Sequence, residues 1–254
     1  MIRESLPDLA NPDLVDAVAD KAARATTLLR NIARDYAPVV FANSLGAEDM
    51  LLTDLIWRED INIGIFSLDT GRLPPETYEL IHRAEQHYGH KLDIFFPRHE
   101  AVETYARTHG SHGFYDSVEA RKACCHARKV EPLQRALAGK GAWVTGLRAG
   151  QSATREKLKV ISQDTANNLV KASPLTDWSE TEVWVYLRAN GVPYNHLHDR
   201  GYPSISCAPC TRAIQPGEDV RAGRWWWETP ETKECGLHLV DGRFQRVGRQ
   251  RAEA

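Results

Sequence analysis

The residues that stand out chemically are five cysteines, four of which form two close pairs. Cys124 and Cys125 are adjacent within RKACCHARK, and Cys207 and Cys210 form a CxxC pair further along the chain. Four thiols in two pairs suit a Zn²⁺ ion or an iron–sulfur cluster. The alternative is that the first pair is buried packing, because free cysteine is often buried. The basic residues around that pair argue against this alternative, since cations stabilise thiolates.

The spacing of the first pair separates the two metal hypotheses. Zinc sites usually place about two to four residues between paired ligands, so an adjacent pair favours a cluster. The fifth cysteine, Cys235, lies in KECGLH, between Lys233 and His238. A cysteine close to a cation and a histidine is a candidate nucleophile, because both groups favour the reactive thiolate.

Other motifs could bind the anionic parts of a nucleotide. SLGAED covers residues 44–49 between a predicted strand and a predicted helix, and SLDTGR covers 67–72 and ends the next predicted strand. Each alone is typical of a connecting turn, but two such turns at one sheet edge predict a shared cleft. Loop arginines can bind phosphate or sulfate oxygens through two N–H groups. The arginines in predicted loops are Arg148, Arg155, Arg221 and Arg224. We expect the Trp run at 225–227 to anchor its loop rather than stack on a base.

Hydrophobic patterning predicts the elements that position these motifs. A helix begins at Asn11-Pro12 and continues to about residue 36. Strands are expected at 38–44, 61–71, 91–96 and 142–147, and helices at 50–59, 74–89, 99–109 and 116–138. After residue 160 we expect one more strand and a helix with a capping box at Ser179 and Glu182, followed by irregular chain from 191. This alternation predicts one α/β domain with a mostly parallel sheet flanked by helices.

Composition narrows the classes of partner. The chain has 254 residues and a net charge of −2, so nothing in its overall charge predicts binding to nucleic acid. It contains no apolar run of the roughly 18 residues that a membrane span needs. The first residues lack the apolar stretch of a signal peptide, so we expect a cytoplasmic protein with reduced thiols. We divide the chain into a helical segment at 1–36, an α/β domain at 37–212, and a mobile segment carrying Cys235 at 213–254.

Taken together, the motifs resemble one family, the assimilatory adenylylsulfate (APS) reductases, which are the iron–sulfur members of the phosphoadenylylsulfate/adenylylsulfate reductase family. Seven motifs occur in family order: SLGAED, SLDTGR, KACCHARK, TGLRAGQSATR, CAPCTR, GRWWWE and KECGLH. The resemblance covers about residues 38–240 and implies the PP-loop fold, which is also called adenine-nucleotide α-hydrolase-like. It implies that APS is reduced to sulfite and AMP for cysteine biosynthesis, with thioredoxin as the electron donor.

The resemblance also implies a role for each motif. Cys235 would be the nucleophile and would carry an S-sulfo intermediate. A [4Fe–4S] cluster with a structural and electrostatic role would be bound by Cys124, Cys125, Cys207 and Cys210. The side chains facing the phosphosulfate would be Lys129, Arg221, Arg224 and His238. The nucleotide pocket would be lined by Ser44, Leu45, Gly46, Glu48, Asp49, Leu68, Asp69, Thr70, Gly71, Arg72, Gly146, Arg148 and Arg155.

Three alternatives stay open at this stage. The substrate could be 3′-phosphoadenylyl sulfate (PAPS), alone or together with APS, although the paired cysteines favour APS. The four cysteines could instead hold zinc in a binding module. An ATP-dependent PP-loop ligase is disfavoured because SLGAED lacks the second glycine that a pyrophosphate-binding loop needs. The sequence leaves assembly into a homo-oligomer open.

Overall fold

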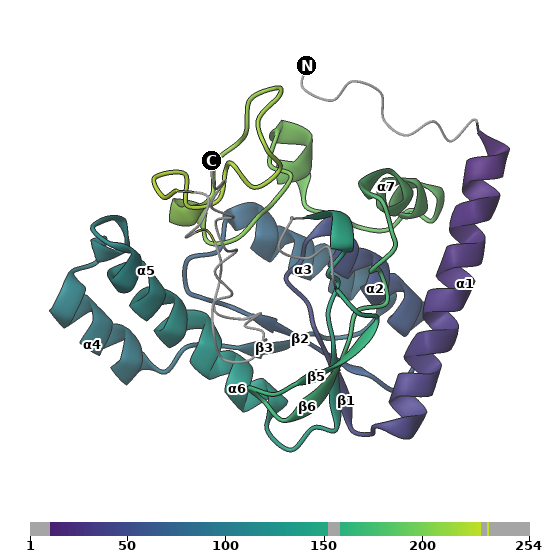
Figure 1. Cartoon of the computed structure of the whole chain (residues 1–254), viewed down its shortest axis with the longest axis horizontal. Helices are drawn as coiled ribbons and strands as arrows, with labels where there is room; N and C mark the ends of the chain where they lie inside the picture. Colours follow the sequence, from purple (N-terminus) through teal and green to yellow (C-terminus); the bar gives the residue numbers. More distant parts are fainter. Residues whose placement is uncertain (1–10, 152–157, 230–232, 234–254) are drawn as a thin grey trace, which may run out of the picture.

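The structure is a computed structural model that describes residues 11–151, 158–229 and 233 (Figure 1). Six strands form one sheet in the order β3-β2-β1-β4-β6-β5. Four parallel pairings join β3 to β6, and the edge strand β5 runs antiparallel to β6. The strands are β1 (Val39–Ala42), β2 (Gly64–Leu68), β3 (Asp93–Phe95), β4 (Ala142–Val144), β5 (Ile161–Asp164) and β6 (Leu169–Ala172). The predicted mostly parallel α/β sheet is therefore confirmed.

Alternating side chains of the central strands pack on opposite faces of the sheet. Phe41 and Ile65 belong to the larger core, which α1 (Pro12–Asp35), α2 (Ala47–Arg58), α3 (Pro75–Tyr88) and α7 (Glu180–Ala189) help to form. Val40, Phe66 and Trp143 point to the other face and pack against α6 (Glu131–Leu137). This alternation follows from the two-residue period of a strand, so one short strand supplies two hydrophobic cores.

The segment predicted as one helix at 116–138 is divided in the structure. It consists of α5 (Val118–Cys125), a π-helical turn η2 (His126–Val130) and α6. A π turn inserts an extra residue into the helix, and such turns are common at functional sites. Here the turn begins directly after the adjacent cysteines and carries Lys129, so the helix axis is interrupted where the candidate site residues lie.

The remaining elements differ from the prediction mainly after residue 160. One strand was expected there, but β5 and β6 form an antiparallel hairpin. The capping box of Ser179 and Glu182 is confirmed at the start of α7. The short helices are η1 (Gly113–Tyr115), η3 (Ala149–Gln151), η5 (His196–Arg200) and η6 (Ala208–Cys210), with α4 (His99–His109) beside α5 (Figure 1). Among the described residues, none of the helices combines the length and the apolarity needed to cross a bilayer.

Candidate active site

One cavity of about 260 Å³ opens at the carboxyl ends of the central strands. Three connections that directly follow β1, β2 and β4 line it, as expected for a ligand site in a parallel sheet. The rest of its wall comes from η2, α6, α7 and the irregular chain from 198 to 225. The predicted residues that line it are Ser44, Leu45, Gly46, Glu48, Asp49, Leu68, Thr70, Lys129, Gly146, Arg148, Arg221 and Arg224.

The turn after β1 is held in shape by its own side chains. Leu45 has a φ of +63°, which is uncommon for a residue with a side chain, and its N–H donates to Asn43 Oδ1 at 2.6 Å. Asp49 Oδ2 accepts from the Ser44 N–H at 2.6 Å and from the Ser44 hydroxyl at 2.5 Å. Because Asp49 lies in the first turn of α2, the helix and the turn are joined.

Asp49 also joins this turn to the one after β4. A Cβ added to Gly146 would stand 2.0 Å from Asp49 Oδ1, so only glycine allows the two turns to approach this closely. Burial raises the pKa of Asp49 to about 6, although its hydrogen bonds from Ser44 and Gly146 act in the opposite direction. The buried carboxyl group of Asp49 therefore connects the two cavity-lining turns through hydrogen bonds.

Arg148 makes polar contacts within the cavity wall. Its Nε donates to Glu48 Oε1 at 2.8 Å, and Gln151 donates to the same oxygen at 3.0 Å. A second guanidinium nitrogen donates to the carbonyl of Trp178 at 3.3 Å. The loop after β4 is thus fixed to the start of α2 by a largely buried ion pair.

Three cations, from η2 and from the irregular chain beyond residue 198, line the cavity. Lys129 Nζ donates to Ser206 Oγ at 2.6 Å, and Arg224 donates to Ser204 Oγ at 3.1 Å. Arg221 donates to the carbonyl oxygen of Lys233 at 3.0 Å. Both serines precede the CxxC pair in the sequence PSISCAPC, and our sequence reasoning did not select them.

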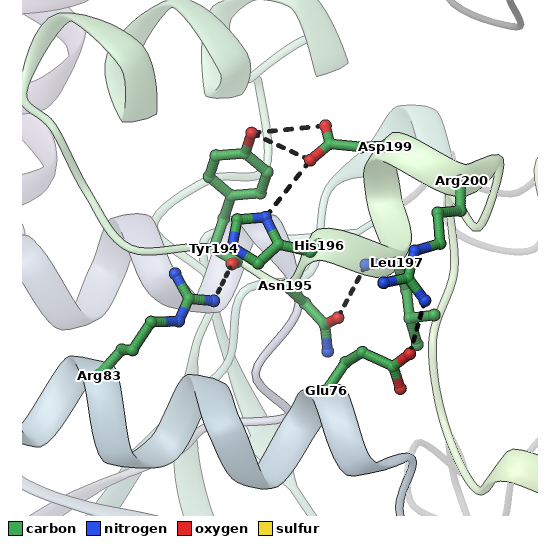
Figure 2. Close-up of polar contacts among 8 residues, drawn as sticks. All are labelled: Glu76, Arg83, Tyr194, Asn195, His196, Leu197, Asp199 and Arg200. Carbon is green, nitrogen blue, oxygen red and sulfur yellow. Dashed lines mark hydrogen bonds and ion pairs between the residues drawn. The ribbon is translucent and has the colours of Figure 1, made fainter.

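The η5 segment that leads to these serines is fastened to α3 (Figure 2). Arg83 donates to the carbonyl of Tyr194 at 2.8 Å, and Arg200 forms an ion pair with Glu76 at 2.7 Å. Asn195 Oδ1 accepts from the Leu197 N–H and caps η5. These contacts hold His198, which is buried and lines the cavity and which sequence reasoning also missed.

The four paired cysteines line a second, smaller cavity. Its volume is about 20 Å³, and Arg72, Arg121, Arg128 and Lys129 lie in the same wall. All four thiols are buried and free of disulfides. Thus α5 and the η6 turn bring together Cys124, Cys125, Cys207 and Cys210, and their predicted role as metal ligands stays a prediction.

The thiols lie in surroundings of mixed character. Burial raises the pKa of Cys124, and it raises that of Cys210 to about 12, while neighbouring cations act in the opposite direction. Thr70 Oγ1 lies 3.2 Å from Cys207 Sγ. In the part of the chain that the structure describes, no three His, Cys, Asp or Glu side chains are placed to hold one metal ion. Four free, buried cysteine thiols that line one cavity are nevertheless the type of donor that iron–sulfur clusters use.

The predicted SLDTGR residues are placed in different surroundings. Leu68 and Thr70 line the large one, whereas Arg72 lines the thiol cavity and lies 4.8 Å from the Phe114 ring centroid. Asp69 accepts from the Gly71 N–H at 2.7 Å and from the Tyr78 hydroxyl at 2.9 Å, which shapes the turn. Asp69 and Gly71 line neither cavity, and their role in nucleotide binding stays a prediction.

Three predicted site residues, Arg155, Cys235 and His238, lie outside the described residues. Lys129 and Trp225 line both cavities, so the wall between the cysteines and the large cavity contains these two side chains. Trp225 is buried and Trp226 is exposed, so the first tryptophan of the run anchors its loop as expected.

Known proteins of similar sequence belong to one family. The phosphoadenosine phosphosulfate reductase domain family matches residues 38–213. An adenosine 5'-phosphosulfate reductase from Allochromatium vinosum is 60% identical over 223 residues, covering 88% of this chain and 87% of the relative. A protein of the same name from Burkholderia cepacia is 56% identical over 227 residues, covering 89% and 91%.

Solved structures agree on the fold. A phosphoadenylyl-sulfate (PAPS) reductase from Candida auris, in a phosphate complex, superposes with a TM-score of 0.65 at 26% identity, covering 79% of this chain and 96% of that one. Yeast FAD synthetase, at 15% identity, has a TM-score of 0.53 over 84% of this chain and 70% of its own, which indicates a shared fold alone. The chain therefore belongs to the phosphoadenosine phosphosulfate reductase family.

Proposed function

We propose that this chain reduces adenylyl sulfate to sulfite and AMP. The observation that carries the proposal is the large cavity itself, which joins nucleotide-type turns to three cations and shares a wall with the cysteine cavity. The curated relatives described above are named adenosine 5'-phosphosulfate reductases, which favours APS over PAPS. The product sulfite would enter cysteine biosynthesis, and the reaction would take place in the cytoplasm.

The lining of the cavity offers two kinds of chemistry. The turns at Ser44 and Gly146 present backbone and small polar groups, which suit the ribose and base. Lys129, Arg221 and Arg224 supply positive charge for the phosphosulfate, whose oxygens are strong acceptors. In the proposed complex, the nucleoside lies along the strand ends and its anionic group faces the cations.

The first chemical step transfers the sulfo group to Cys235. The thiolate attacks the sulfur atom, the bond from that sulfur to the bridging oxygen breaks, and AMP leaves with both electrons of that bond. The enzyme then carries Cys–S–SO₃⁻. The three cations would stabilise the charge that develops on the bridging oxygen. Cys235 is two residues beyond Lys233, whose carbonyl is bonded to Arg221, and two residues span at most about 7 Å.

The second step uses a dithiol protein of the thioredoxin class. One thioredoxin thiolate attacks the Cys235 sulfur, a mixed disulfide forms, and sulfite leaves with the electron pair of the S–S bond. The second thioredoxin thiol then resolves the mixed disulfide and restores the Cys235 thiolate. The dithiol thus provides the two electrons that reduce the sulfur.

We also propose that Cys124, Cys125, Cys207 and Cys210 hold a [4Fe–4S] cluster. Four buried thiols around one cavity, within a ring of cations, match the donor set and the negative charge of such a group. When bound, the cluster supplies a covalent tie between α5 and the CxxC turn and a fixed charge near Lys129. His238 and Arg155 would complete the substrate site.

Sulfite release tests the proposed function. Anaerobically purified protein should convert APS and reduced thioredoxin to sulfite and AMP in equal amounts, and Cys235→Ser should form neither while keeping its iron. A higher kcat/KM for PAPS would instead identify a PAPS reductase. A colourless protein with stoichiometric zinc would contradict the cluster, and ATP hydrolysis without sulfite would indicate a PP-loop ligase.

A further inference from the structure

Trp225 occupies an unusual position in the proposed site, since it lines the substrate cavity and the cysteine cavity at once. Its side chain is 1% exposed, and its backbone has a φ of +41°, which residues with side chains rarely adopt. The backbone N–H of Trp225 donates to the backbone carbonyl of Cys210 at 3.1 Å. The backbone of Trp225 is therefore joined to the CxxC turn by a hydrogen bond, and its ring lines the cysteine cavity beside that turn.

Two arginines lie over this ring. The guanidinium carbon of Arg121 is 4.6 Å from the Trp225 ring centroid, and that of Arg224 is 4.7 Å from it. The electron-rich faces of tryptophan attract cations, and this attraction strengthens when water is excluded. Trp225 thus brings one cation from α5 and one from the cavity loop to the same buried ring.

The two arginines are held in different ways. Arg121 forms two hydrogen bonds with the Glu228 carboxylate, at 2.8 and 2.7 Å, and both side chains are almost fully buried. Arg224 instead lines the substrate cavity and donates to Ser204 at 3.1 Å. Arg121 is therefore a fixed support, while Arg224 presents its charge to the cavity.

We infer that Trp225 is a positioning residue that orients the Arg224 guanidinium towards the anionic group of the substrate. An arginine side chain has four rotatable bonds, so ordering it costs rotamer entropy. The ring and Ser204 together fix the guanidinium before the substrate arrives, which leaves more of the interaction for the transition state. The inference rests on the proposed function, because it assumes that Arg224 meets the phosphosulfate.

The shared ring also connects the cysteine cavity to the anion site. Glu228 forms an ion pair with Arg121, and Arg121 and Arg224 both contact the Trp225 ring. The backbone of Trp225 is hydrogen-bonded to Cys210. A change in the CxxC turn would move the ring and, with it, the guanidinium. This path uses Trp225 and is additional to Lys129, which also lines both cavities.

A double-mutant cycle tests the inference in the loaded enzyme. Trp225→Leu should lower kcat/KM for APS by roughly 10- to 100-fold, as expected when a catalytic charge moves by about 1 Å. Trp225→Phe, which keeps an aromatic face, should recover most of the activity. If Trp225 acts through Arg224, then adding Trp225→Leu to Arg224→Ala should cause less than about a threefold further loss. Equal losses in both backgrounds, or failure of the Phe variant to recover activity, would overturn the inference.

Two controls keep the outcome interpretable. Trp226→Leu changes the exposed neighbour and should leave kcat/KM unchanged. Calorimetry of AMP binding to the wild type, the two single variants and the double variant reports the Arg224 contact without turnover. The losses of AMP affinity in the two single variants should not add in the double variant. Absence of sulfite formation by the wild-type protein would refute the proposed function, whereas additive AMP affinities would refute the positioning role. If Trp225→Leu does not fold, Trp225→Met takes its place in the cycle, because methionine adapts to irregular space in a core but has no aromatic face.

Discussion

Replacing Gly146 with alanine tests the closest approach in the candidate site. The added methyl carbon would stand 2.0 Å from Asp49 Oδ1 and 3.2 Å from both the Asp49 carboxyl carbon and Glu48 Cβ. Real carbon–oxygen contacts need roughly 1 Å more, and close-packed interiors transmit such strain. Because Asp49 is bonded to the Ser44 backbone and hydroxyl, it cannot turn away without opening the turn after β1. The turns after β1 and β4 must therefore separate.

The expected loss follows from that displacement. A shift of about 1 Å in a substrate-positioning turn can reduce the rate about 100-fold. Overpacking of this kind also lowers the free energy of unfolding by about 1–3 kcal/mol. The assays are steady-state kinetics with APS and calorimetric titration with AMP, alongside thermal unfolding.

Gly150 provides the matched control, since it lies in the same connection and an added Cβ meets only an Arg148 nitrogen, at 3.8 Å. Gly150→Ala should retain AMP affinity and stability within about 0.5 kcal/mol. If Gly146→Ala behaves like this control in all three measurements, the described contact between the two turns is wrong.

Three further predictions address other parts of the molecule. Glu228→Gln should lower the free energy of unfolding by about 3–5 kcal/mol, because it leaves the buried Arg121 charge without its carboxylate. The control Glu218→Gln, at an exposed ion pair, should lower it by under about 1 kcal/mol. Equal losses for the two variants in denaturant unfolding would contradict the importance of the buried pair. Burial raises the pKa of Asp49 to about 6 in the folded state, so its contribution to stability is complete below pH 4 and is lost as the pH rises through 6. The stability of wild type relative to Asp49→Asn should therefore fall by about 2 kcal/mol between pH 4 and pH 6, and by about 3 kcal/mol between pH 3 and pH 8; a pH-independent difference would refute the assignment. Cys124→Ala should lose iron and the brown colour, and full iron content by metal analysis would show that this thiol is not a ligand.

The sequence predicts the sheet and the ends of its central strands because these features depend on local patterns. Runs such as PVVFANS are apolar on both faces, which marks a buried parallel strand. The β5–β6 hairpin was incompletely predicted because ISQD at its edge is polar and largely exposed. The π turn was missed because the 116–138 segment keeps a helical pattern on both sides of it.

The site was predictable where neighbouring residues form a motif, and not where distant residues meet. Arg121 and Glu228 are separated by 107 positions, and each alone is typical of a solvated surface residue. The close approach of Gly146 to Asp49 likewise depends on how two strand ends are placed. Ser204 and Ser206 carry no signal beyond their position before the CxxC pair.

The central claim is that Cys235 accepts the sulfo group from a nucleotide bound in the large cavity. Anaerobic protein incubated with APS in the absence of thioredoxin should be digested and examined by mass spectrometry. We expect one equivalent of AMP in solution and the mass of one SO₃ group on the Cys235 peptide, removed as sulfite when reduced thioredoxin is added. AMP release with an unmodified Cys235 peptide, or the same adduct on another residue, would contradict the account.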